Sequence, residues 1–91
     1  MARVLVLLKV FPEDINIDLE DLKRRIKEKL PENYEIARHD IEPIAFGLKA
    51  LRLYVLIPEE TEGGTETLEK TVESVEGVSQ VEVEAVHRIT E

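Results

Sequence analysis

Few side chains in this chain of 91 residues could perform covalent or metal chemistry. There is no cysteine, which excludes disulfides, thiolate nucleophiles and cysteine-type zinc sites. The two histidines, His39 and His87, could form a catalytic pair or a metal site only if the fold brought them together. The chain has 20 acidic residues, so two carboxylates close together would not by themselves indicate a catalytic site. We therefore expect no covalent enzyme, no cofactor and no metal site.

A glycine pair stands where a phosphate-binding loop could lie. Gly63, Gly64 and Thr65 come just before a predicted helix, as in loops that hold phosphate. Such loops usually contain a lysine, whereas the flanking residues here are Glu59, Glu60, Glu62 and Glu66. These glutamates would repel an anion, so we interpret the segment as a flexible turn.

Phe46 is one of only two phenylalanines and lies in a connection that also contains Pro43 and Gly47. Two interpretations are open. The ring could cover the core at this connection, with Gly47 supplying a positive φ. Alternatively, Pro43 and Gly47 could hold an exposed ring rigidly for insertion into a pocket of a partner.

The charge distribution argues against nucleic acid as a direct partner. The net charge is −8, and residues 1–56 hold ten acidic and ten basic residues. The excess therefore lies in the last 35 residues, where Lys70 and Arg88 are the only bases. Binding to a phosphate backbone depends on lysine and arginine, so a partner with a basic surface is the better expectation.

Length and composition bound the class of protein. Ninety-one residues with 43% hydrophobic side chains fit one globular domain, residues 1–91. No apolar run approaches the roughly 20 residues of a membrane span, and no signal peptide is evident, so we expect a cytoplasmic protein. Abundant Glu, Lys and Arg with little Asn, Gln or Cys resembles proteins from hot environments.

The apolar pattern predicts six elements. We expect strands at Arg3–Phe11, Tyr34–Glu42, Lys49–Ile57 and Val78–Ile89, and helices at Leu19–Leu30 and Glu66–Glu76. Asp18 should cap the first helix and Thr65 the second, and Gly77 should end the second helix. The order β-α-β-β-α-β predicts a ferredoxin-like α+β sandwich with an antiparallel sheet of strand order 4-1-3-2 and both helices on one face.

This fold leaves one face of the sheet without helices. The central strands should place four apolar residues there: Leu5, Leu7, Tyr54 and Leu56. They could be ordinary scattered surface residues or a contact patch. An alternative function follows from the second interpretation: a small regulatory module that binds a metabolite or associates weakly with itself through this open face.

The segment Pro43–Leu51, PIAFGLKAL, resembles the signature P-I-[GA]-[FY]-G-[IL]-K-x-L of the guanine-exchange domain of elongation factor 1-beta. The chain length, the element order, the stretch GGTETLE and the ending VEGVSQVEVEAVHRI also resemble the short archaeal form. The resemblance implies a guanine-nucleotide exchange factor that acts on elongation factor 1-alpha during translation and performs no covalent chemistry.

The resemblance also implies roles for particular residues. The motif aromatic, Phe46, would contact the partner together with Pro43, Ile44, Gly47 and Lys49. A basic residue followed by an aliphatic one near the C-terminus would enter the Mg²⁺ and phosphate region, which assigns that role to Arg88 and Ile89.

Two features depart from the family pattern. Eukaryotic members usually have lysine at the position of Arg88, and arginine mimics a compact cation less well, so Arg88 could contact phosphates or carboxylates instead. Arg88 could also be a strand-end charge paired with a glutamate. The chain further extends by Thr90 and Glu91 beyond the usual end.

Overall fold

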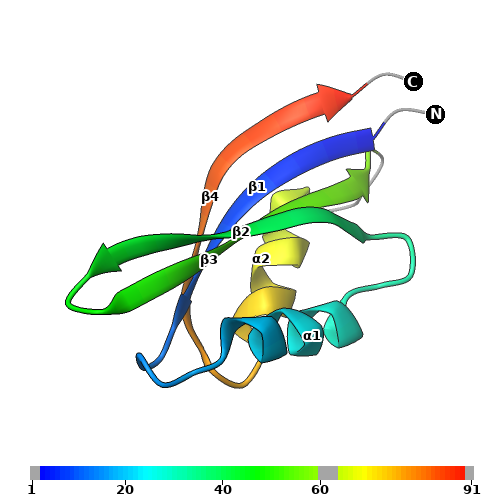
Figure 1. Cartoon of the computed structure of the whole chain (residues 1–91). Coiled ribbons are helices and arrows are strands. Elements are labelled where there is room, and N and C mark those ends of the chain that lie inside the picture. The colour runs from blue at the N-terminus through cyan, green and yellow to red at the C-terminus, as the bar shows by residue number, and fades with distance from the viewer. Residues whose placement is uncertain (1–2, 60–63, 90–91) are drawn as a thin grey trace.

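The computed structural model describes residues 3–59 and 64–89, which form one four-stranded sheet and two helices (Figure 1). The elements are β1 (Arg3–Pro12), α1 (Leu19–Lys29), β2 (Glu35–Ala45), β3 (Leu48–Pro58), α2 (Thr65–Glu73) and β4 (Val78–Ile89). The predicted order β-α-β-β-α-β is confirmed. Gly63, Thr90 and Glu91, on which the sequence also raised expectations, lie outside the described residues.

The sheet has the predicted strand order. The strands lie in the order β2-β3-β1-β4, which is the order 4-1-3-2 read from the other edge. Every pair of neighbouring strands is antiparallel. Figure 1 shows both helices on the same side of the sheet. The molecule is elongated, with extents of 41 × 20 × 18 Å. The ferredoxin-like sandwich is therefore confirmed.

The core lies between the helices and the two central strands. Val6, Leu8 and Val10 alternate along β1 and are fully buried, as the period of two predicts. Burying each such side chain contributes roughly 1.5–3 kcal/mol. The other fully buried side chains come from β3 and the helices: Leu22, Ile26, Ala50, Leu51, Leu53, Val55, Leu68 and Val72. This core fixes the orientation of β3, which leads out of the core to the β2–β3 connection.

The capping prediction is confirmed for α1 and wrong at both ends of α2, which ends at Glu73 with Ser74 as its C-cap rather than at Glu76 before Gly77. Asp18 Oδ1 accepts hydrogen bonds from the amides of Glu20, at 2.9 Å, and Asp21, at 3.4 Å. In α2, Thr65 is already helical, and Gly64 occupies the cap position without a side chain to offer. Gly64 has φ +57, a conformation that glycine adopts without strain, and this places the helix start one residue earlier than predicted.

The β2–β3 connection is much shorter than the sequence suggested. β2 continues through residues 43–45 to Ala45, which pairs with Leu48, so only Phe46 and Gly47 form the turn. Pro43 is tolerated because β2 is an edge strand, where a missing N–H need not break a ladder. A register shift between Pro43 and Ala45 accommodates one extra residue. The segment that looked like a loop is thus the end of a β-hairpin.

Candidate partner-binding site

Phe46 occupies the tip of the β2–β3 hairpin and is fully exposed, with 100% of its surface accessible. Figure 1 shows this hairpin extending beyond the helix layer. The interpretation that the ring covers the core is therefore wrong. The physical reason is the two-residue turn, which leaves no connection long enough to fold the ring back over the core.

The turn holds Phe46 in an unusual backbone conformation. Its φ is +51, and it is the only residue other than glycine with positive φ in the described part of the chain. Gly47 has φ +81, and two positive φ values in a two-residue hairpin turn are the mark of type I′. Asparagine or glycine normally takes the first of these positions. An aromatic there costs stability through backbone strain, and its exposed ring recovers none of that cost by packing; such strain is typical of functional sites.

The residues that the motif groups with Phe46 lie along the same hairpin. Pro43, Ile44, Gly47 and Lys49 are all exposed. Five large apolar residues of the described chain are exposed, and four of them lie on the hairpin or on the β1–α1 loop beside it: Ile15, Ile41, Ile44 and Phe46. Clustered exposed apolar side chains mark contact surfaces. Sequence reasoning missed Ile15 and Ile41.

Two ion pairs on the open face fix the base of the hairpin. Arg52 donates to both oxygens of Asp40, at 2.7 and 2.9 Å. This fork holds the pKa of Asp40 below its ordinary value despite partial desolvation. Lys9 Nζ lies 2.9 Å from Glu42 Oε2, and this contact raises the pKa of Lys9. Each pair connects β2 to a different central strand and adds to the β2–β3 pairing that holds the hairpin.

Arg88 and Ile89 lie at the C-terminal end of β4. Arg88 pairs across the sheet with Val4, and its guanidinium is 2.6 Å from a carboxylate oxygen of Glu59. The ion pair with a glutamate is therefore present, but the Arg88 side chain remains 69% exposed. Ile89 pairs with Arg3 and is half-buried. Arg88 can thus reach solvent or a partner after giving up one surface contact.

The structure does not bring these two predicted contact elements together. Val4 pairs with both Arg88 and Ile57, whereas the turn joins β3 at Leu48. The strand from Leu48 to Ile57, at roughly 3.3 Å per residue, spans about 30 Å. In Figure 1 the hairpin tip and the end of β4 lie at opposite ends of the molecule. Any partner that uses both must contact the chain at two separate places.

The histidines are also apart. His39 lies on β2 and His87 on β4, the two outer strands of the sheet. His39 Nε2 is 3.0 Å from Glu20 Oε2. Among residues 3–59 and 64–89, no three side chains of His, Cys, Asp or Glu gather in a way that could hold a metal ion. Neither described helix is long and apolar enough to cross a membrane.

The open face is less apolar than predicted. Leu5, Leu7 and Tyr54 are only partly exposed, and Leu56 is buried at 8% exposure, so its predicted place in an exposed patch is wrong. The Tyr54 ring is covered by the Arg38 guanidinium, 5.7 Å from its centroid. Neighbouring polar side chains thus cover part of the apolar surface that this face would otherwise present.

Comparison with solved structures agrees with the fold. The C-terminal domain of the MgtC protein from Mycobacterium tuberculosis superposes with a TM-score of 0.57 at 14% identity, covering 96% of this chain and 85% of that one. At such low identity this likeness concerns the fold alone.

Sequence comparisons identify the family. The family described as the EF-1 guanine nucleotide exchange domain matches residues 5–89. A protein named elongation factor 1-beta from Staphylothermus marinus is 79% identical over 90 residues, covering 99% of this chain and 100% of the relative. Relatives of the same name from Hyperthermus butylicus and Saccharolobus solfataricus are 62% and 52% identical, covering 100% and 98% of this chain and 99% and 98% of theirs. These archaeal, heat-adapted sources agree with the composition. The chain therefore belongs to the EF-1 guanine nucleotide exchange domain family.

Proposed function

We propose that the chain is an exchange factor that accelerates GDP release from elongation factor 1-alpha and so allows GTP to load. The observation that carries this proposal is the match of residues 5–89 to the exchange-domain family. The exposed hairpin tip, with Phe46 inside the family motif, supports it by supplying a contact surface.

The physical requirement for exchange is differential binding. A translational GTPase holds its nucleotide through phosphate contacts and a bridging Mg²⁺. A factor accelerates release if it binds the empty GTPase more tightly than the GDP-bound form. By linkage, GDP weakens binding of the factor by the same ratio by which the factor weakens binding of GDP. No bond in the nucleotide is made or broken, so the factor needs no catalytic side chains.

In this proposal Phe46 is the binding anchor. An exposed aromatic ring that enters an apolar pocket of the partner loses its contact with water and contributes a large share of binding energy. Because the type I′ turn has few alternative conformations, the backbone of the hairpin tip loses little freedom when the ring binds. Pro43, Ile44, Gly47 and Lys49 line the same hairpin end and would border that contact.

Arg88 and Ile89 act at the opposite end, near the phosphate and Mg²⁺ site of the GTPase. To do so, Arg88 gives up its ion pair with Glu59 and contacts a group of the partner instead. Loss of this ion pair costs little, because exposed ion pairs contribute only about 0–1 kcal/mol. The planar guanidinium matches oxyanions, so we assign it to phosphates or carboxylates of the partner rather than to the metal position. The factor therefore spans about 30 Å of the GTPase surface between its two contacts.

A translation factor works beside ribosomes, so we place this activity in the cytoplasm. The partner is the GTPase itself, without direct contact to nucleic acid or a membrane and without a cofactor. The alternative, a regulatory module that binds a metabolite or self-associates through the open face, is not favoured by the family match. Weak self-association through that face is compatible with exchange activity.

The test is a nucleotide-release assay. Elongation factor 1-alpha loaded with fluorescent GDP is mixed with excess unlabelled GTP, with and without the factor at micromolar concentration. The proposal predicts faster loss of the fluorescent nucleotide with the factor. An unchanged rate with folded factor would refute it. Release of GDP should be slower with Arg88→Ala than with the wild-type factor. Arg88→Lys should retain the acceleration of release.

A further inference from the structure

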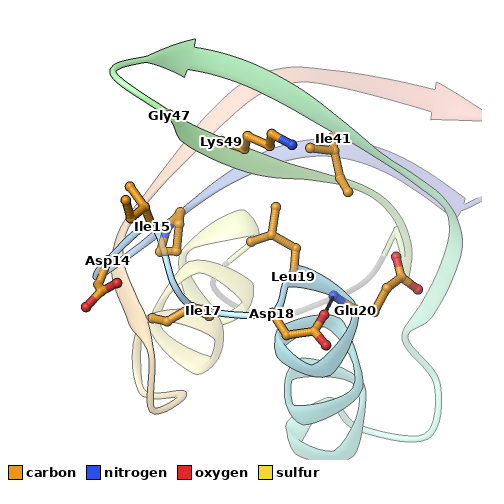
Figure 2. Close-up of a pocket in the computed structure, with 10 residues that line it drawn as sticks. Asp14, Ile15, Ile17, Asp18, Leu19, Glu20, Ile41, Gly47 and Lys49 are labelled. Carbon is orange, nitrogen blue, oxygen red and sulfur yellow. Dashed lines mark hydrogen bonds between the residues drawn. The ribbon is translucent and has the colours of Figure 1, made fainter.

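A groove lies between the β2–β3 hairpin and the loop that joins β1 to α1 (Figure 2). It has a volume of about 280 Å³. Pockets that enclose small-molecule ligands usually measure roughly 300–1,000 Å³, so this groove is slightly smaller than the usual site for a metabolite. Its size fits one or two side chains of a protein partner better.

The groove has apolar walls on both sides. Ile41 projects from the hairpin, and Leu19 projects towards it from the start of α1, as Figure 2 shows. Ile15, on the loop, is 61% exposed, and Ile41 is 44% exposed. Both could be polar without loss of core packing, because neither belongs to the core cluster. Large apolar side chains facing one another across an open groove are suited to receive a third from a partner.

The charges around the groove are predominantly negative. Asp14, Asp18 and Glu20 line the helix side, and Lys49 is the only base among the lining residues. Asp14 and Asp18 each accept bonds from nearby amides, and Glu20 contacts His39. A carboxylate has about four acceptor positions, so these contacts leave acceptors for a further donor. The rim thus complements a cation.

The groove is continuous with the proposed contact surface. Gly47 and Lys49 belong to the hairpin motif and also line the groove, and Gly47 adjoins Phe46. A partner surface that takes up the Phe46 ring would therefore also cover the groove opening. The occupant must then belong to the same partner.

We propose that this groove receives an apolar side chain of the GTPase that stands next to a lysine or arginine. The inference rests on the proposed exchange function and adds Ile15, Ile41 and Asp14 to the residues that bind the partner. The apolar side chain packs between Ile15 and Ile41, and the neighbouring base contacts the carboxylates of the rim. Salt should weaken the second contact more than the first.

The experiment measures release of fluorescent GDP at increasing concentrations of each factor variant and reports the half-saturating concentration. Ile15→Ser should raise the half-saturating concentration about tenfold, and Ile15→Leu, which keeps an apolar side chain of the same size, should raise it much less. Ile41→Thr, which keeps a β-branched residue in the strand, repeats the test from the other wall. Melting temperatures close to that of the wild type will show that the variants are folded.

The charge contribution has a matched control. Asp14→Asn keeps an acceptor for the amide of Asn16 but removes the charge, and it should raise the half-saturating concentration at low salt. Glu32→Gln, an equal loss of charge at an exposed position after α1, should have no effect.

Three outcomes would overturn the inference. Variants of Ile15 and Ile41 that match the wild type would exclude the groove while leaving the exchange function intact. Variants that change self-association of the factor alone, without changing release, would identify a second copy as the occupant. A wild-type factor that does not accelerate release at all would refute both the exchange function and the inference.

Discussion

Replacing Phe46 with asparagine should stabilise the protein and weaken its function. The ring is fully exposed, so its removal forfeits no buried surface. A residue other than glycine at φ +51 carries a cost of about 1–2 kcal/mol, and asparagine before glycine, the preferred pair of a type I′ turn, should remove about half of it, ~0.5–1 kcal/mol. An unfolding entropy of about 2.1 cal/mol/K per residue gives about 0.19 kcal/mol/K for the 91 residues, so Tm should rise by about 3–5 °C.

The same change should impair partner binding. Truncation of a buried aromatic anchor costs about 2 kcal/mol, which corresponds to about 30-fold in the factor concentration needed for half-maximal GDP release. Calorimetry or circular dichroism measures Tm, and the release assay measures function. The two effects have opposite signs, so misfolding cannot mimic them.

Two control variants separate strain from contact. Phe46→Ala removes the ring but stays in the strained conformation, so it should lose function without gaining stability. Phe46→Tyr keeps an aromatic that the family motif allows, so it should retain function. A lower Tm for Phe46→Asn would show that the ring contributes to packing, and wild-type release by that variant would show that the ring is not an anchor. Either result refutes the reasoning.

Three further predictions concern the tail, the hairpin base and α1. Arg88→Ala should lower the maximal rate of GDP release and change unfolding free energy by less than about 1 kcal/mol, because its ion pair with Glu59 is exposed; normal release would refute its role. The pKa of Asp40 lies below its ordinary value of 3.8, so the stability it contributes is present above that pH and is lost as pH falls through the lower, folded-state pKa. Asp40→Asn should therefore unfold more easily at neutral pH and show a shallower loss of stability below about pH 4, and an unchanged acid profile in denaturant titrations would contradict the role of Arg52. Asp18→Ala should reduce unfolding free energy by about 0.5–2 kcal/mol through loss of the helix cap, with Asp18→Asn as the control that keeps it.

The fold could be predicted because its strongest signals are local and agree with one another. Alternation in Arg3–Pro12 and Leu48–Pro58 marks the central strands, and Asp18 followed by Leu19, Leu22 and Ile26 marks a capped amphipathic helix. The N-cap of α2 is harder to predict than that of α1. Both Gly64 and Thr65 are suitable N-cap residues, and only the backbone conformation decides between them.

Whether the Phe46 ring is buried or exposed could not be predicted from the neighbouring residues in the sequence. Proline and glycine around an aromatic fit both a loop folded over the core and a tight hairpin, and the choice depends on whether Pro43 can continue an edge strand. In the structure, Pro43 does continue the edge strand, because it pairs with Lys49 of β3. The placement of Phe46 and Arg88 at opposite ends, by contrast, follows from the directions and lengths of the strands once the antiparallel sheet is accepted.

The groove has only a weak signal in the sequence. Ile15 lies in a short irregular loop without periodicity, and Ile41 looks like any apolar residue of an edge strand. Both line one groove because the hairpin extends beyond the helix layer, which depends on the lengths of β2 and β3. An isolated apolar residue among Asp14, Ile15 and Asn16 was the only available hint.

The central claim is that the hairpin end binds the GTPase while the tail end loosens its nucleotide. The most direct test is the rate of fluorescent GDP release from elongation factor 1-alpha, followed by stopped flow as the concentration of factor rises. We predict a saturating increase for the wild type, the same plateau at about 30-fold higher concentration for Phe46→Ala, and a lower plateau for Arg88→Ala. A rate that stays at the spontaneous value at every wild-type concentration would contradict the account.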